Sequence, residues 1–175
     1  MKGMKMIRGK MQSASLVAIA MSVMAGTAWA QASAAAAKDA AVLYFSKQQT
    51  DAGFEKGVLV LYDSTDQGGR YMVETPRRDT DGGGEVHVKD TELVYVVKGS
   101  ATVVTGGTLA DINPHPATRP GNPHPEYEIR GARIVGGEEH HLGVGDMIII
   151  PAGMPHQYKV LEAPFWYLVV KSRQP

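Results

Sequence analysis

From residue 57 onward the chain consists of short runs rich in Val, Ile, Tyr and Thr, separated by Gly, Pro, Asn and Asp. Residues of the first kind favour extended strands, and residues of the second kind end strands in turns. Many short strands with turns between them are typical of an all-β sandwich or barrel. The expected strands lie near 58–62, 70–74, 85–88, 93–97, 101–105, 132–135, 147–150, 157–161 and 165–171.

Two of these strands carry polar side chains that can hold a metal ion, each strand on a single face. Side chains alternate across a strand, so Glu85 and His87 point to the same side of the segment GEVHV. A short turn follows, and the next strand begins with Glu92, which faces the same side as Val94 and is followed by further apolar residues. The sequence therefore predicts that three side chains able to hold a metal ion lie close together.

A second segment, GDMIIIPAGMPH, carries another such side chain. An apolar strand near 147–150 enters a corner formed by Pro151, Gly153 and Pro155, and His156 begins the strand that leaves this corner. Proline fixes its backbone angle and glycine permits a sharp turn, so a corner of this composition is rigid. A rigid corner is a suitable place from which to hold a ligand side chain.

The two segments resemble the two motifs of the cupin superfamily, G-x5-H-x-H-x3/4-E-x6-G and G-x5-P-x-G-x2-H-x3-N. The resemblance covers residues 82–160, with Glu85 in place of the first motif histidine and Val160 in place of the final asparagine. It implies an all-β double-stranded β-helix, or jelly-roll barrel, with a short N-terminal helix outside it. It also implies that His87, Glu92 and His156 bind a metal ion.

The metal itself follows only in part from the residues. The chain has no cysteine, so a metal must be bound through nitrogen and oxygen. Iron, manganese, zinc and nickel all accept such ligands, and the carboxylate of Glu85 in place of an imidazole favours iron or manganese over copper. Two alternatives stay open: Glu85 lies near the metal without binding it, or the barrel has lost its metal and is empty or holds an organic ligand.

The first thirty residues have the three parts of a secretory signal. A basic segment at 1–12 precedes an apolar run at 13–27, and Ala-Trp-Ala at 28–30 fits a cleavage site. We expect cleavage after Ala30 and a periplasmic or secreted protein without membrane attachment, the alternative being an uncleaved membrane anchor. The expected parts are the signal at 1–30, a helical segment at 31–56 and the barrel domain at 57–175.

Charge excludes one class of partner. Four of the eighteen basic residues and none of the eighteen acidic ones lie in the expected signal, so the remainder has a net charge of −4. A mildly acidic domain lacks the basic surface with which proteins bind nucleic acid. The expected partner is a small-molecule substrate or ligand.

Two turns and one long loop are expected between the strands. Lys98-Gly99-Ser100 is predicted to form a tight hairpin, and residues 143–146 a further turn. Five of the ten prolines lie between residues 114 and 125, so residues 106–130 are expected to form a long loop, either a lid over the site or a surface segment. His115 and His124 in this loop are expected to be solvated, or else to contact a bound substrate.

Several other residues have an ordinary structural interpretation beside a functional one. Adjacent strand residues point to opposite faces, so His140 and His141 are interpreted as a surface pair and not as a metal site. Arg77 and Arg78 are expected to be a solvated pair, or an anion site. Tyr158 shares a strand face with His156 and either reaches the cavity or packs. The other aromatic side chains of the expected strands are assigned to the core and barrel wall: Tyr95, Trp166 and Tyr167.

The resemblance specifies the fold but not the reaction, because cupins include dioxygenases, decarboxylases, isomerases and binding or storage domains. We expect a metal-dependent enzyme of the oxygenase or isomerase type that acts on a small organic molecule. The alternatives are a non-enzymatic periplasmic binding domain for a small ligand and an oligomeric scaffold. The resemblance also implies a homodimer that pairs through exposed strands.

Overall fold

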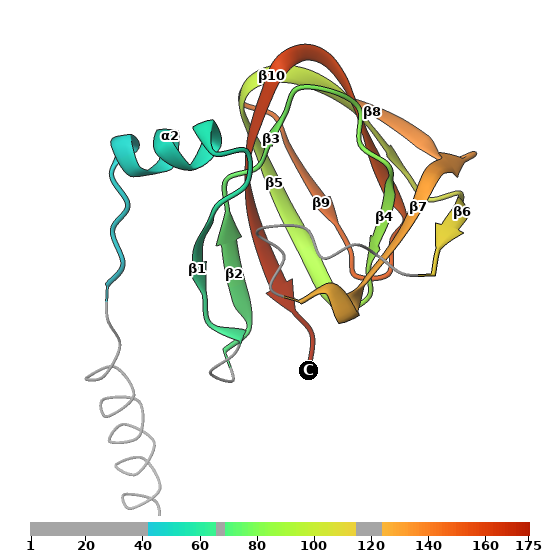
Figure 1. Cartoon of the computed structure of the whole chain (residues 1–175), viewed down its shortest axis with the longest axis horizontal. Coiled ribbons are helices and arrows are strands. Elements are labelled where there is room, and N and C mark those ends of the chain that lie inside the picture. The colour runs from blue at the N-terminus through green and yellow to red at the C-terminus, as the bar shows by residue number, and fades with distance from the viewer. Residues whose placement is uncertain (1–41, 66–68, 115–123) are drawn as a thin grey trace, which may run out of the picture. The chain divides into compact units, whose positions relative to one another are not determined.

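Residues 42–65, 69–114 and 124–175 are described by a computed structural model (Figure 1). Their strands are antiparallel and curl into a barrel, which confirms the all-β jelly-roll class. The strands are β1 (Val60–Asp63), β2 (Tyr71–Glu74), β3 (Arg77–Arg78), β4 (Gly84–His87), β5 (Asp90–Thr105), β6 (Thr108–Asn113), β7 (Glu128–Val135), β8 (Glu138–Leu142), β9 (Met147–Ile150) and β10 (His156–Arg173).

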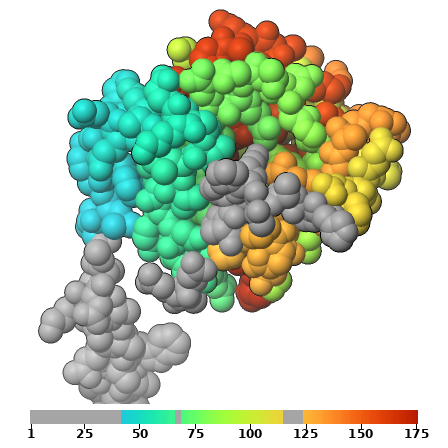
Figure 2. All heavy atoms as spheres, viewed as in Figure 1, coloured from blue at the N-terminus to red at the C-terminus, as the bar shows by residue number. Residues whose placement is uncertain are grey.

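The two long strands β5 and β10 pair along almost their whole length, from His156 opposite Thr105 to Arg173 opposite Asp90. Both strands bend midway and so belong to both walls of the barrel, and the red bend of β10 forms the upper edge in the space-filling view (Figures 1 and 2). The predicted hairpin at 98–100 is wrong, because β5 continues through it. Gly99 adopts a φ of 72°, which bends the strand, and a Cβ there would lie 2.3 Å from the Glu162 carbonyl oxygen.

Strands β8 and β9 pair with the other edge of β5, at its two ends. The predicted turn between them at 143–146 is confirmed: the Asp146 amide donates to the Gly143 carbonyl over 3.0 Å, and the Gly143 amide donates to the Asp146 carboxylate over 2.8 Å. Strand β8 was not among the predicted strands, because its sequence EEHHL contains a single apolar residue. Its strand form comes from pairing with β5, and not from its own propensity.

The predicted long loop at 106–130 is wrong at both of its ends. Strand β6 begins at Thr108 and pairs with β7, which begins at Glu128 after a 3₁₀ turn at Pro125–Tyr127. Residues 115–123, which include His115, lie outside the described residues. Strand β6 ends at Asn113, just before the first of the prolines.

Helix α2 (Lys47–Glu55) is the helical element of the described residues, within the expected helical segment at 31–56. Ser46 caps it by accepting from the Gln49 amide, and the Gln49 side chain accepts from the Ser46 amide in return. Phe54 near its end stacks on Trp166 of β10 at 5.0 Å. The expected signal at 1–30 lies outside the described residues, and among those described no helix has the length and apolarity needed to cross a bilayer.

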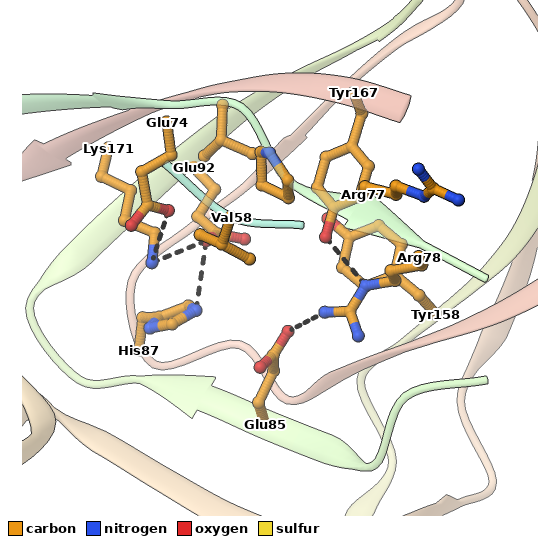
Figure 3. A pocket seen from close by; sticks show the side chains of 12 residues that line it. Val58, Glu74, Arg77, Arg78, Glu85, His87, Glu92, Tyr158, Tyr167 and Lys171 are labelled. Atoms are coloured by element: carbon orange, nitrogen blue, oxygen red, sulfur yellow. Dashed lines mark hydrogen bonds and ion pairs between the residues drawn. The ribbon is translucent and has the colours of Figure 1, made fainter. Parts of the chain in front are cut away.

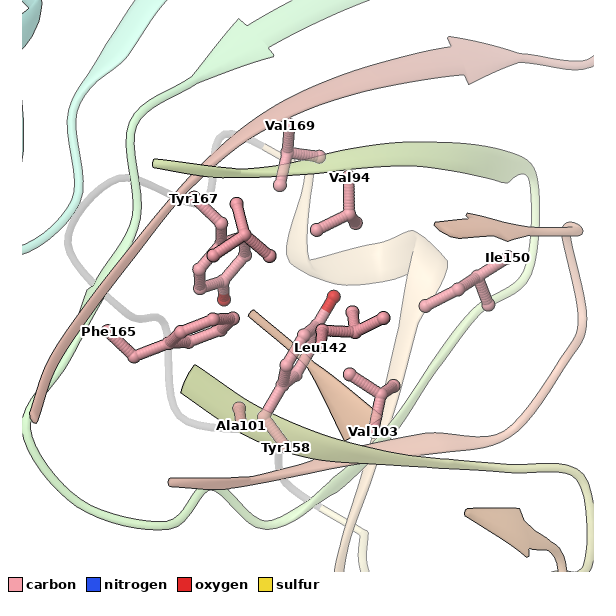
Figure 4. Close-up of a cluster of buried hydrophobic side chains, with 10 residues drawn as sticks. Val94, Ala101, Val103, Leu142, Ile150, Tyr158, Phe165, Tyr167 and Val169 are labelled. Atoms are coloured by element: carbon pink, nitrogen blue, oxygen red, sulfur yellow. The ribbon is translucent and has the colours of Figure 1, made fainter. Parts of the chain in front are cut away.

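The core fills the part of the barrel in which β5, β8, β9 and β10 face one another (Figure 4). Val94 and Val96 of β5 are fully buried, as alternation predicts, together with Phe165 and Tyr167 of β10. The assignment of Tyr95 to the core or wall is wrong, because it faces outward and is 43% exposed. The core cluster comprises Val94, Val96, Ala101, Val103, Leu142, Ile150, Tyr158, Phe165, Tyr167 and Val169.

Candidate metal centre

Three strands bring the four predicted side chains together inside the barrel. Glu85 and His87 come from β4, Glu92 from the start of β5, and His156 from the start of β10, directly opposite Glu85 in the register. All four residues are at least 95% buried. The alternation argument for Glu85 and His87 therefore holds, and tertiary pairing adds His156 from a distant part of the chain.

The donor atoms lie close to one another. Nε2 of His87 is 3.1 Å from Oε1 of Glu92, and Nε2 of His156 is 3.3 Å from Oε2 of Glu92 and 3.5 Å from Oε1 of Glu85. Atoms bound to one metal at about 2.0–2.2 Å lie roughly 3.0–3.5 Å apart. Glu85, His87 and His156 also each offer one donor atom within 4.8 Å of the others. The spacing therefore fits a mononuclear metal site.

The corner before β10 orients His156. Its Nδ1 lies 3.1 Å from the Met154 carbonyl, so Nδ1 donates there and the neutral ring carries its lone pair on Nε2. The corner is itself tied to the other strand of the site, since the Gly153 amide donates to the His87 carbonyl over 2.8 Å. Such a fixed ring orientation is what a metal-binding histidine requires.

Two buried atoms of the group, Nε2 of His156 and Oε2 of Glu92, make no hydrogen bond of good geometry among the described residues. They face each other at 3.3 Å as an ion pair. Buried polar atoms are usually hydrogen-bonded, and a cation between these two would satisfy both.

A second set of buried charges surrounds the group. Glu85 contacts two guanidinium groups, Nη2 of Arg78 at 3.0 Å and Nη2 of Arg130 at 2.9 Å. Glu92 contacts the Lys171 ammonium at 3.4 Å, and the same ammonium lies 3.4 Å from Glu74. Both candidate carboxylate ligands are thus already paired with cations.

These contacts shift the protonation of the group. Burial by itself lowers the pKa of His156, but the Glu85 and Glu92 carboxylates outweigh it and raise that pKa to about 10. Burial raises the pKa of both glutamates, yet His156 and Arg78 hold the pKa of Glu85, and His87 and Lys171 that of Glu92, well below the usual range. Without a metal, His156 is therefore an imidazolium at neutral pH, and a metal must displace its proton.

A cavity of about 40 Å³ adjoins the group (Figure 3). This space suits roughly three or four water-sized groups beside the side chains. The guanidinium of Arg78 and the ring of Tyr158 lie on one side of it, and Lys171 and Glu74 on the other. The wall comprises Val58, Glu74, Pro76, Arg77, Arg78, Glu85, His87, Glu92, Tyr158, Tyr167, Val169 and Lys171.

The two arginines before β4 differ from the prediction and from each other. Arg77 pairs with the half-exposed carboxylates of Glu55 and Asp79. Arg78 is not solvated: its side chain is 13% exposed, donates to the Tyr167 hydroxyl over 2.8 Å and lies over the Tyr158 ring at 4.7 Å. The expectation of a solvated pair is therefore wrong for Arg78.

The remaining histidines lie apart from this group. His140 and His141 contact Thr105 and Thr102 on opposite sides of β8, at 2.9 and 2.8 Å, as the alternation argument predicts. The expectation that His124 is solvated is wrong. Its side chain is 11% exposed, and its Nε2 lies 2.6 Å from the hydroxyl of Thr65 and 3.2 Å from Oδ2 of Asp63 in β1.

Sequence reasoning missed Lys171 and Arg130. For Lys171 a signal existed, because alternation along β10 places it on the same face as Tyr167 and Val169, where a lysine needs a buried anion. Arg130 had no comparable signal, since it lies next to Glu85 only through the pairing of β4 with β7.

The sequence matches no protein-family model and no curated protein. Solved structures with a similar chain course include KdgF from Halomonas sp. (16% identity over 68% of this chain and 82% of that one, TM-score 0.44). The cupin domain of Schizosaccharomyces pombe Cnp3 is 8% identical over 67% of this chain and 60% of that one, with a TM-score of 0.45. Oxalate decarboxylase from Lactobacillus farciminis is 17% identical over 66% of this chain and 28% of that one, with a TM-score of 0.44.

At these identities the likeness assigns no activity or ligand to this chain. The fold class follows instead from its own strand topology, which forms a jelly-roll barrel, and its two motif segments resemble those of the cupin superfamily. Inside this barrel lies a group of histidine and glutamate side chains able to hold a metal ion.

Proposed function

We propose that this barrel binds one divalent metal ion and is a metal-dependent enzyme of the oxygenase or isomerase type that acts on a small organic molecule. One observation carries the proposal: Nε2 of His87 and Nε2 of His156 both face the buried carboxylate of Glu92, at 3.1 and 3.3 Å, a spacing that one metal ion can bridge. Exposed acidic clusters are common without a metal, but a fully buried group of imidazoles and carboxylates is costly unless its charges are compensated.

His87, Glu92 and His156 would hold the metal, with Glu85 as a fourth ligand or as an anion beside it. A bound metal would supply Lewis acidity, or dioxygen activation if it is iron. The Met154 carbonyl keeps Nε2 of His156 directed into the site, and Lys171 keeps Glu92 ionised. The buried apolar side chains of Val94 and Ile150 exclude bulk water from the metal site.

The donor set narrows the choice of metal. Two imidazoles and one or two carboxylates suit iron, manganese, zinc and nickel. With both glutamates bound, the harder oxygen-rich set would favour iron or manganese. We therefore propose one of these two as the native metal.

Elemental analysis of the protein, purified without added metal or chelator, tests the proposal. We expect about one metal ion per chain, and we expect His156→Ala to lose both the metal and any activity. His141→Ala is the matched control, because it removes an imidazole from the outer surface of the same barrel and should keep the metal. A wild-type protein without metal, or equal metal contents in the two variants, would contradict the proposal.

One observation favours a second candidate, a non-enzymatic barrel that binds a small ligand without metal. With His156 as an imidazolium, the buried charges already form ion pairs among themselves. This candidate predicts that ligand affinity survives chelation and His87→Ala. Complete loss of ligand binding on chelation would exclude it.

Self-association is proposed for the outer face of β5 and β9. Leu93, Tyr95 and Val97 on β5 are 37–43% exposed, and Met147 and Ile149 beside them on β9 are 58% and 60% exposed. The patch is apolar and uncharged, so a second copy would cover it without repulsion between like charges. Light scattering should give twice the chain mass, and Ile149→Lys should give a monomer with unchanged metal content; a wild-type monomer would contradict this proposal.

Export is proposed from the signal at 1–30. Fractionation of cells that express the whole chain should place the protein outside the cytoplasm, with Gln31 as the first residue of the mature form. A cytoplasmic protein that retains residues 1–30 would contradict export.

A further inference from the structure

The two tyrosines in the cavity wall differ in one respect. Tyr158 and Tyr167 stack at 5.0 Å and are both buried. The Tyr167 hydroxyl accepts a hydrogen bond from Nε of Arg78 over 2.8 Å. The Tyr158 hydroxyl, in a side chain that is 1% exposed, has no hydrogen-bond partner among the described residues. A buried phenol usually finds a partner, so this hydroxyl indicates a ligand atom that accepts from it.

The ring of Tyr158 is held too firmly for its hydroxyl to reach another partner. Arg78 lies over one face, and Phe165 and Tyr167 pack beside it. The imidazole of His156 meets the ring edge-on at 5.9 Å. The ring is therefore fixed within the interior that also holds the candidate metal ligands, and Tyr158 is one of the residues that line the cavity of about 40 Å³.

Charge determines which kind of acceptor fits. Glu85 pairs with Arg78 and Arg130, but Arg130 also pairs with Glu128. Glu92 shares the ammonium of Lys171 with Glu74. Four carboxylates thus face three cations, and a bound divalent ion would change this net charge of −1 to +1. An anion in the cavity would offset this positive charge, in surroundings of low dielectric where this attraction is strong.

We propose that the cavity binds a small monoanion with a carboxylate-like group, and that Tyr158 selects it by donating a hydrogen bond to one of its oxygens. The second oxygen would face the metal held by His87, Glu92 and His156. This inference rests on the proposed metal site and adds to it a substrate class, small organic acids of about four non-hydrogen atoms, and a specificity residue, Tyr158. The volume excludes larger acids unless the wall moves.

Binding of acetate and acetamide to the cobalt-loaded protein tests the proposal. The two probes have the same size and shape, but only acetate is charged, and the visible absorption of cobalt reports ligand exchange. We expect acetate to bind at least about tenfold more tightly than acetamide. Tyr158→Phe should weaken acetate binding by about tenfold or more, the usual effect of losing a hydrogen bond to a charged group.

Tyr95→Phe is the matched control, because it removes the same hydroxyl from the outer face of β5. It should leave acetate affinity unchanged. In the absence of acetate, Tyr158→Phe should melt at the wild-type temperature or above it, since it removes a buried polar atom to which no residue of the described ranges hydrogen-bonds. A lower melting temperature would indicate that this hydroxyl serves packing instead, and would overturn the inference.

Elemental analysis of each cobalt-loaded sample distinguishes failure of the proposed metal site from failure of the monoanion site. A wild-type protein that holds no cobalt would overturn the proposed metal site. Retained cobalt with equal affinity for acetate and acetamide, or with acetate affinity unchanged by Tyr158→Phe, would overturn the monoanion site alone.

Discussion

The interior of the barrel has two regions built from the same strands. Strand β5 contributes Glu92 to the ionic region and Val94 to the apolar one, and β10 contributes Lys171 and Phe165 in the same way. In the apolar region (Figure 4) each side chain contributes in proportion to the area it buries. In the ionic region (Figure 3) each group depends on a particular partner, because an unpaired buried charge is far more costly than a small void.

The largest expected effect is on stability when the ionic region loses a cation. Lys171→Met leaves the buried carboxylates of Glu92 and Glu74 without the ammonium, and should lower the free energy of unfolding of the metal-free protein by about 3–5 kcal/mol. Urea unfolding measures this change. Lys159→Met is the control: Lys159 pairs with Glu139 on the surface, and its loss should cost less than about 1 kcal/mol.

Adding metal to Lys171→Met tests whether Glu92 is a metal ligand. Without Lys171, the charge of Glu92 is no longer offset, so a bound cation should recover more stability in Lys171→Met than in the wild type. Equal recovery in both proteins would show that Glu92 does not contact the metal.

A smaller effect is expected from the apolar region. Phe165→Leu keeps a hydrophobic side chain but loses ring contacts with Tyr167 at 4.9 Å and Tyr158 at 6.2 Å, and should cost about 1–3 kcal/mol. Metal content should stay that of the wild type, because no charge is unpaired. Loss of metal together with this loss of stability would show that the two regions are coupled and not separate.

The smallest expected effect is a dependence of stability on pH. The pKa of His156 is raised to about 10 in the folded metal-free protein, from an ordinary value near 6.5. Its contribution is therefore fully present below about pH 6.5 and is lost as pH rises to about 10, at up to about 1.4 kcal/mol per pH unit. Unfolding curves at pH 7 and pH 8 measure this loss, and His156→Gln should abolish it.

Metal binding should reverse this dependence, since the metal displaces the proton of His156 and so binds more tightly as pH rises. A wild-type protein whose metal-free stability is the same at pH 7 and pH 8 would contradict the ionic contacts of His156.

Local features of the sequence predicted much of the fold and the candidate site. Alternation along a strand places Glu85 with His87 and Glu92 with Val94, and the Pro-Gly corner places His156 at the start of a strand. These inferences held because each depends only on residues that are close together in the sequence. The prediction at Gly99 failed for the same reason: a glycine with positive φ permits either a hairpin or a bend, and only the partner strand β10 selects the bend.

The sequence by itself therefore determined the class of fold, the faces of the strands and the residue types of the candidate site. Tertiary structure alone decided that Arg130 would lie beside Glu85 and that Lys171 would lie opposite Glu92. It also decided that the Tyr158 hydroxyl would be buried without a hydrogen-bond partner in the described part of the chain. The physical reason is that a buried charge or hydroxyl is defined by its partners, and in an antiparallel barrel these come from strands far apart in the chain. Their register is set by the whole sheet, which no short segment encodes.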